Sequence, residues 1–471
     1  MSQGSVTRDD AGSHSPKGAL GLPAAIALIM GSIVGTGIFT LPSAIAKFGS
    51  AGLVGFLIAT IGAIALALVF ASLSRIIPAQ GGPYAYAREG FGDVAGFLNA
   101  FSYWCAAWPG NSGIVISWVF YVQALFGLDA GNRLQSILIA LIGLWVPVVI
   151  NLMGAQSMGA FQVITTILKF IPLVFLATVG VVLAFSRGNW PTWNPGGGST
   201  TFAISSALTI ATFAYVGVET AAIAAAKVRD PEKNVPRATV LGTLTTALVY
   251  LLVTVAVFGI VPNQVLQTSG APFSDAFNLI FGGTWGGKLV ALFAVISGIG
   301  ALNGWTMICG EVPQAAARDK LFPEVFARQN KHGVPSFGIV ISAALASVAA
   351  VMALATTGGV AAFSQIVLFS GVTVGLPYFF SVMVQLYYLY TRGRRLNPAT
   401  FPREVILAVI ALVFTFWMIA GSGQLAVYLA FLLFLLGLLM MTYLYIKTGR
   451  FGASRLEPVE RSSVHTSSDL E

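Results

Sequence analysis

Apolar runs of 18 or more residues recur along almost the whole sequence, and no other feature constrains the fold as strongly. An α-helix needs about that length to cross a lipid bilayer. Only 9% of the residues are charged, against about 25% in a typical soluble protein, so we predict an all-α integral membrane protein. The predicted spans number about twelve and lie at residues 20–46, 51–77, 91–126, 134–152, 157–185, 201–225, 238–261, 285–313, 335–356, 360–390, 404–422 and 425–446.

The positions of the basic residues support this span count. With both termini placed in the cytoplasm, twenty of the 25 Lys and Arg residues fall on the inner side, four on the outer side and one within a span. Inner loops of membrane proteins carry such an excess of Lys and Arg. A miscounted span would scatter these charges over both faces. We therefore expect a multi-pass protein of the plasma (inner) membrane with cytoplasmic tails at 1–19 and 447–471.

Several functional classes are disfavoured by composition. The net charge of +8 comes from inner loops and does not indicate nucleic acid as a partner. Cys105 and Cys309 lie in apolar spans, while His14, His332 and His465 lie in tails or a loop, so neither a disulfide framework nor a metal centre is predicted. No GxxxxGK[ST] loop for ATP occurs, and we expect no cofactor.

Two spans are interrupted by glycines and polar residues. The segment GSIVGTGIFTLP (31–42) lies in the first span, and ATFAYVGVETAAIAAA (211–226) lies five spans later. Because five is odd, a second copy of a five-span unit must run inverted through the membrane. We predict an inverted 5+5 repeat with broken helices 1 and 6, at 20–200 and 201–390, followed by two accessory helices at 404–446.

An opened helix at membrane depth exposes N–H groups at one half-helix end and carbonyls at the other. These groups suit the carboxylate and the ammonium of a zwitterion. Glycines in membrane helices can also serve only close packing, but that alternative accounts less well for two breaks at matching positions. We expect Gly35, Thr36 and Gly37 to donate to a substrate carboxylate. Ser32 and Ile33 are candidates on the ammonium side.

These segments resemble signature sequences of the amino acid–polyamine–organocation (APC) transporter superfamily. GSIVGTGIFTLP is similar to its first-helix signature and FAYVGVETAAIAAAKVRDPEKNVPRA to its sixth-helix signature, while PAQGGPYAYAREGFG and AAARDKLFPEVFARQNKHGVP resemble its loops after the second and eighth spans. YWCAAWPGN and GALNGWTMICG look most like its basic amino-acid and polyamine antiporters, among them the arginine/agmatine exchangers. The resemblance implies that Tyr103, Ala214 and Gly217 also belong to the substrate site.

Two ionisable residues lie deep within predicted spans, where a charge is costly. Glu219 either makes a structural hydrogen bond in the broken sixth helix or, as the resemblance implies, couples protonation to conformational change. Lys169 is about 18 Å from either end of its span, too deep to reach the headgroups. The resemblance implies that such a Lys replaces a sodium ion and bonds first-helix carbonyls and an eighth-helix hydroxyl, for which Ser297 is our candidate.

Aromatic residues within spans usually belong to the core, but two have a further role by resemblance. Phe213 corresponds to an aromatic gate over the substrate, and Trp305 to a tryptophan beside the pocket. A cationic side chain would gain about 0.5–2 kcal/mol from each ring. The arginine/agmatine exchangers carry Asn and Trp where this chain has Ser32 and Phe213, and a small apolar residue where it has Lys169. These departures bear on substrate and coupling.

We therefore expect a secondary transporter that works by alternating access in the bilayer and is no enzyme. The sharpest hypothesis is sodium-independent exchange of a basic amino acid for its amine, and the alternative is proton-coupled uptake of neutral or broad-range amino acids. A channel would need rings of charge or a repeated filter motif. An enzyme would need a recognisable catalytic cluster. A homodimer is compatible with these expectations.

Overall fold

The computed structural model describes residues 21–77, 81–154, 158–223, 228–393 and 401–448, and these residues form helices and no strand. The predicted N-terminal tail, 1–19, lies outside the described residues. So does the predicted C-terminal tail, 447–471, except for its first two residues. The helices of the predicted first repeat are α1 (Leu22–Ile33), α2 (Gly37–Ala46), α3 (Gly49–Ile76), α4 (Pro83–Phe126), α5 (Arg133–Leu152), α6 (Met158–Phe175) and α7 (Val181–Arg187), with a π-helical segment Leu176–Gly180 between the last two.

The second half of the chain repeats this succession of long helices. Its elements are α8 (Thr200–Thr212), a 3₁₀ turn Phe213–Tyr215, α9 (Thr220–Ile223), α10 (Pro231–Ile260), the short α11 (Asn263–Leu266) and α12 (Pro272–Phe281), α13 (Trp285–Arg318), a 3₁₀ turn Glu324–Ala327, α14 (Ser336–Thr356) and α15 (Gly359–Tyr388), which continues into a π-helical segment Leu389–Gly393. The accessory helices are α17 (Phe401–Ala420) and α18 (Gln424–Thr448).

Ten helices in the described residues are long and apolar enough to cross a membrane, or eleven when the bent pair α1 and α2 counts as one span. The predicted span at 91–126 is helical within α4 but is not among them. Its apolar pattern is interrupted by polar residues that are buried inside the bundle, among them Asn99, Ser102, Asn111, Ser112 and Ser117. The chain is therefore a multi-pass membrane protein, as predicted.

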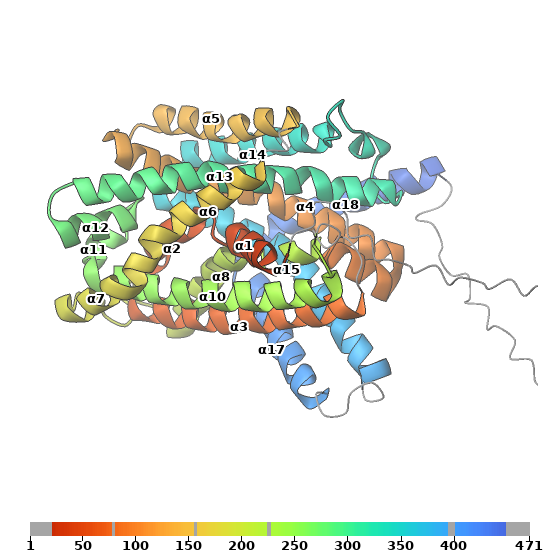
Figure 1. The fold of residues 1–471 in the computed structure, drawn as a ribbon, viewed down its shortest axis with the longest axis horizontal. Helices are drawn as coiled ribbons and strands as arrows, with labels where there is room; N and C mark the ends of the chain where they lie inside the picture. Colours follow the sequence, from red (N-terminus) through yellow and green to blue (C-terminus); the bar gives the residue numbers. More distant parts are fainter. Residues whose placement is uncertain (1–20, 78–80, 155–157, 224–227, 394–400, 449–471) are drawn as a thin grey trace, which may run out of the picture.

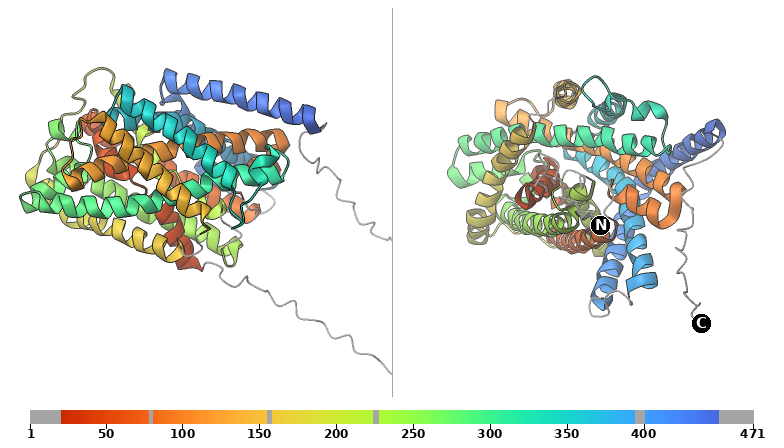
Figure 2. Two further views of the ribbon diagram at one scale, coloured as in Figure 1. Left: turned by 90° about the horizontal axis from the view of Figure 1, so that it is seen from above. Right: turned by 45° about the vertical axis from the view of Figure 1, so that its right-hand side comes forward.

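The broken helices lie at the centre of the bundle. In Figure 1, α1 is seen nearly end-on between α13 on one side and α10 and α3 on the other. α4 packs chiefly against α15 and α13. α18 lies along the outside of the bundle, as the two views of Figure 2 show. This arrangement places both helix breaks away from lipid, where opened backbone is tolerated.

Contacts between loops show which helix ends lie at the same end of the bundle. These agree with the membrane faces that the charge pattern predicts for the loops. Arg88 Nη1 lies 2.6 Å from Asp319 Oδ2, which joins the start of α4 to the end of α13. At the other end, Ser50 N donates to Thr192 O at 3.1 Å, and Arg187 Nη2 donates to Leu279 O at 2.6 Å. Loops predicted on one face thus contact each other.

Candidate functional site

The first helix break falls inside the glycine-rich segment. α1 ends at Ile33, α2 begins at Gly37, and the two helix axes differ in direction by 41°. Gly37 is needed because a Cβ atom there would lie 2.8 Å from the ring of Phe213. Gly35 has more room, since its nearest neighbour would be Ile114 at 3.9 Å. The break therefore gives the Phe213 ring a close approach to the backbone.

The second break faces the first. α8 ends at Thr212, and α9 begins at Thr220. Between them Gly217 has φ of 115°, a conformation that residues with a Cβ rarely adopt. A Cβ at Gly217 would lie 3.1 Å from the carbonyl carbon and oxygen of Ser32. The two opened segments thus touch directly, backbone to backbone.

Side chains from other helices satisfy part of the opened α1 backbone. Lys169, only 1% exposed, donates from Nζ to Gly31 O at 2.7 Å and to Val34 O at 2.5 Å. Tyr250 OH donates to Ile33 O at 3.0 Å. The predicted bonds between Lys169 and first-helix carbonyls are present. Ser297 donates instead to Ala294 O in its own helix, at 3.2 Å, because a serine hydroxyl in a helix readily bonds the preceding turn.

Other backbone groups at the first break remain available to a ligand. Gly35 N donates to Ile33 O at 2.8 Å, so its N–H is already used, contrary to its predicted role as a donor to substrate. The N–H groups of Thr36, Gly37 and Ile38 donate to no other group in the part of the chain that the structure describes. They lie at the start of α2, where the helix dipole favours an anion.

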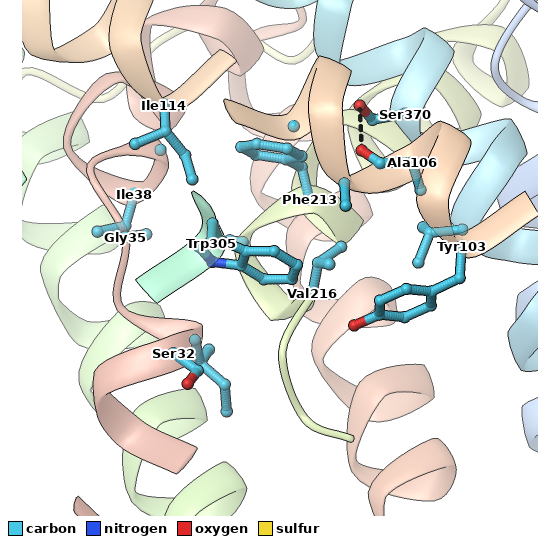
Figure 3. Close-up of a pocket in the computed structure, with 16 residues that line it drawn as sticks. Ser32, Gly35, Ile38, Tyr103, Ala106, Ile114, Phe213, Val216, Trp305 and Ser370 are labelled. Atoms are coloured by element: carbon cyan, nitrogen blue, oxygen red, sulfur yellow. Dashed lines mark hydrogen bonds between the residues drawn. The ribbon is translucent and has the colours of Figure 1, made fainter. Parts of the chain in front are cut away.

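A pocket lies between the two breaks (Figure 3). Its space for water-sized molecules is about 30 Å³, enough for one or two waters, so the site is nearly closed in this structure. Eight of the ten predicted substrate residues line it: Ser32, Ile33, Gly35, Gly37, Tyr103, Phe213, Ala214 and Trp305. Thr36 and Gly217 do not. The Thr36 hydroxyl donates to Ile114 O at 2.7 Å, and Gly217 contacts the α1 backbone.

Half of the pocket lining was not predicted. These residues are Ile38, Ala106, Ala107, Gly110, Ile114, Val216, Ser370 and Val374. Four of them lie on α4 and follow Tyr103 at helical spacing, so they share one face of that helix. That periodicity could have identified them once Tyr103 was assigned to the site. Nothing in the sequence signals Ser370 and Val374 on α15.

Phe213 covers the pocket as the resemblance implies. Its ring lies over Gly37, and a Cβ at Gly113 would come within 3.3 Å of it. It also forms an edge-to-face pair with Phe363 on α15, with the ring centroids 6.0 Å apart. In Figure 3 the rings of Phe213 and Trp305 lie between the α1–α2 connection and Val216. The Phe213 ring, which covers the pocket, therefore contacts three helices, α2, α4 and α15, besides the segment that carries it.

Glu219 is fully buried behind the pocket and joins three segments. Its Oε1 accepts from Tyr103 OH at 2.5 Å, and its Oε2 accepts from Tyr378 OH at 2.7 Å and Gly217 N at 3.2 Å. Tyr378 on α15 was not predicted. A protonated carboxyl oxygen becomes a donor, so protonation of Glu219 changes the hydrogen bonding of at least one of these partners. Because Tyr103 also lines the pocket, such a change would reach the substrate site.

The pocket is lined by backbone, aromatic rings, and aliphatic and serine side chains. Among the described residues no group of three or more His, Cys, Asp or Glu side chains could hold a metal. What the pocket offers is free backbone donors on one side, the carbonyl end of α1 on the other, and aromatic rings between. These groups are complementary to the carboxylate, the ammonium and the apolar part of a small zwitterion.

Comparison with known proteins agrees with this geometry. Residues 20–444 match the family model described as amino acid permease. The chain is 31% identical to a cadaverine/lysine antiporter of Escherichia coli K12, over 86% of this chain and 90% of the relative. It is 30% identical to an arginine/ornithine antiporter of Pseudomonas aeruginosa, over 89% of this chain and 90% of the relative.

Proposed function

This chain belongs to the amino acid permease family, and we propose that it exchanges a basic amino acid for its decarboxylated amine by alternating access. The family consists of membrane transporters and not of enzymes. The observation that carries the proposal is the pocket between two broken helices, with backbone donors on one side and carbonyls on the other. The names of the two antiporter relatives support the choice of basic substrates.

In this proposal the backbone binds the parts common to all amino acids. The N–H groups of Gly37 and Ile38, which line the pocket, receive the carboxylate, and the Ser32 carbonyl receives the α-ammonium. Ser32 O accepts no hydrogen bond from another described residue, whereas the neighbouring carbonyls of Gly31 and Ile33 are occupied. A cationic side chain then lies against the faces of Phe213 and Trp305, where it gains cation–π attraction.

A second candidate function is proton-coupled uptake of neutral or broad-range amino acids. It is favoured by the pocket lining, which contains no carboxylate among its sixteen residues. Glu219 lies behind Tyr103 and could carry the coupling proton in this scheme. The two functions differ in what drives uptake, namely substrate on the opposite side or a pH gradient.

We further propose that transport needs no sodium. The ammonium of Lys169 occupies the Gly31 and Val34 carbonyls, which would otherwise be oxygen ligands for a small cation. Uptake by the purified protein should be equal in sodium and choline buffers.

Lys169→Met removes the ammonium while keeping the bulk of the side chain. It should slow turnover because two buried carbonyls lose their donor.

The deciding experiment uses proteoliposomes with equal pH on both sides. Vesicles preloaded with lysine, ornithine or arginine, or with the corresponding amines, are compared with empty vesicles for uptake of labelled substrate. Rapid uptake only into preloaded vesicles supports exchange. Uptake into empty vesicles that appears only when a pH gradient is imposed, and that includes neutral amino acids, supports the alternative instead.

A further inference from the structure

The start of α2 is attached to α4 by buried hydroxyl groups. Ser117 on α4 donates from Oγ to Thr36 O at 2.8 Å, and its Oγ lies 2.6 Å from Thr40 Oγ1. A serine hydroxyl has one proton. Because Ser117 gives that proton to Thr36 O, Thr40 is the donor in its pair with Ser117. Ser117 thus binds the first turn of α2 at both of its ends.

The two N–H groups assigned to the substrate carboxylate lie between these two attachment points. Gly37 and Ile38 follow Thr36 directly and precede Thr40. Both residues line the pocket, and their N–H groups donate to no other group in the described part of the chain. Since α1 ends at Ile33, no continuous helix precedes α2 to fix the direction of its first turn. Contacts from neighbouring helices have to fix it.

α4 is also the helix that forms one wall of the pocket. It supplies Tyr103 and four further lining residues. A side chain on α4 therefore holds the two donors in place relative to the surface against which the substrate lies. Donors that are held in place before binding lose less conformational freedom when a carboxylate arrives. Ser117 itself does not line the pocket, so its effect on a ligand there passes through α2.

We propose that Ser117 is a positioning residue for the carboxylate of the transported substrate. It holds the first turn of α2 so that the N–H groups of Gly37 and Ile38 face the carboxylate. The inference rests on the proposed function, because that function assigns the carboxylate to these two groups. A basic amino acid carries the carboxylate, and its decarboxylated amine does not. Loss of the Ser117 hydroxyl therefore weakens binding of the amino acid and spares the amine.

The test measures exchange by proteoliposomes, with a basic amino acid and its amine as separate labelled substrates. Ser117→Ala should raise the half-saturation concentration of the amino acid about tenfold, which is the effect of about one hydrogen bond on an equilibrium constant. The half-saturation concentration of the amine should stay unchanged. A residue that only joined two helices would affect both substrates alike.

Thr40 allows the same contact to be tested from the other helix. Thr40→Val removes the hydroxyl and keeps the branched shape, so it should discriminate between the two substrates as Ser117→Ala does. Thr40→Ser keeps the hydroxyl and should behave as wild type. Because both residues belong to one hydrogen-bonded pair, the double variant with Ser117→Ala and Thr40→Val should be less impaired than the sum of the single effects predicts.

Other contacts keep α2 attached when Ser117 is changed, so the variant should fold. Tyr121 OH donates to Phe39 O at 2.8 Å, and Thr36 Oγ1 donates to Ile114 O at 2.7 Å. Binding can also be measured without transport, because a ligand of the folded state raises the melting temperature. In purified Ser117→Ala protein the amino acid should raise the melting temperature less than in wild type, and the amine should raise it equally.

Ser112→Ala is the matched control. Ser112 is a fully buried serine of the same helix, and its Oγ donates to Ala346 O on α14 at 2.8 Å. Its loss removes a comparable hydrogen bond that does not involve α2. Any effect of Ser112→Ala on half-saturation should be the same for the amino acid and for the amine.

The outcomes separate the role of Ser117 from the proposed function. If wild type exchanges basic substrates and Ser117→Ala changes nothing, or weakens binding of amino acid and amine equally, the positioning role is refuted. Discrimination by Ser112→Ala as strong as that by Ser117→Ala would refute it too. If wild-type protein exchanges no basic substrate at all, the proposed function itself fails.

Discussion

Gly217 connects the two broken helices through its lack of a side chain. Its φ of 115° and its contact with the Ser32 backbone both exclude a Cβ atom. Holding a residue other than glycine in such backbone costs about 1–3 kcal/mol. The Ser32 carbonyl that Gly217 touches is the one we assign to the substrate ammonium. A change at Gly217 should therefore affect both stability and binding.

Gly217→Ala should lower the melting temperature of the purified protein and weaken substrate binding, because the methyl group pushes the two breaks apart. Both effects can be measured by thermal unfolding with and without substrate, since a ligand that binds the folded state raises its melting temperature. Gly304→Ala is the control, because a Cβ there meets nothing within 4 Å. An unchanged substrate-induced shift in Gly217→Ala would contradict the role of this contact.

At the scale of elements, Glu219 links the second break to α4 and α15 through two tyrosine hydroxyls. Tyr378→Phe removes one donor without touching the pocket lining. Because the ionised carboxylate loses a charge-assisted hydrogen bond, we expect the pH profile of transport to move toward higher pH while substrate affinity is kept. Tyr103→Phe should change both, since Tyr103 also lines the pocket. The measurement is initial exchange rate against pH.

Tyr86→Phe is the matched control for these variants, because the Tyr86 hydroxyl is buried and has no hydrogen-bond partner among the residues that the structure describes. In a Glu219→Gln background, Tyr378→Phe should cause no further change in the pH profile. Independent shifts from the two substitutions would mean that the tyrosine acts through another group.

α12, outside the candidate spans, contains a carboxyl group whose ionisation opposes folding. Burial raises the pKa of Asp275 above its usual value, although its hydrogen bond from the Ser269 hydroxyl acts in the opposite sense. The folded state thus prefers the protonated form. Its contribution to stability is fully present below the usual aspartate pKa of about 3.9, and it is lost as the pH rises through the higher folded-state pKa.

Asp275→Asn keeps an acceptor for Ser269 and cannot ionise. The melting temperature of this variant should exceed that of wild type at pH 7, and the difference should shrink as the pH falls toward 4. Thermal unfolding across this range measures it, with Asp129→Asn in an exposed turn as the control. A difference that stays constant with pH would show that the ionisation of Asp275 does not contribute.

At the scale of the whole molecule, the sequence predicts well what depends on local pattern. Helix positions follow from apolar run length, and both breaks follow from glycines placed where a span should be continuous. The hydrogen bond from α15 to Glu219 could not be predicted. Tyr378 lies in an apolar run, where a tyrosine is usually a core residue, and it is 159 positions from Glu219 in the sequence. The wrong partner for Ser297 has a similar cause, because one residue type can bond its own helix or a neighbour. These contacts depend on how each helix is rotated about its own axis. The length of an apolar span gives no information on that rotation.

The orientation of the whole chain is the remaining prediction. α13 alone separates the loop before Trp285 from the loop after Arg318, so these two loops must face opposite sides of the membrane. Positive charge favours the cytoplasm for the loop that contains Arg328. In a background where Cys105 and Cys309 are replaced by Ala, we expect Gly283→Cys to react with an impermeant maleimide in intact cells. Arg328→Cys should react only after permeabilisation.

Both native cysteines are buried, so their replacement removes background labelling. Gly283 and Arg328 are exposed in the structure. A cysteine at either position that fails to react in intact cells therefore lies on the inner side of the membrane and is not simply buried. The reverse pattern would invert the whole topology. Labelling of both positions in intact cells would mean that α13 does not span, and the inverted repeat would fail with it.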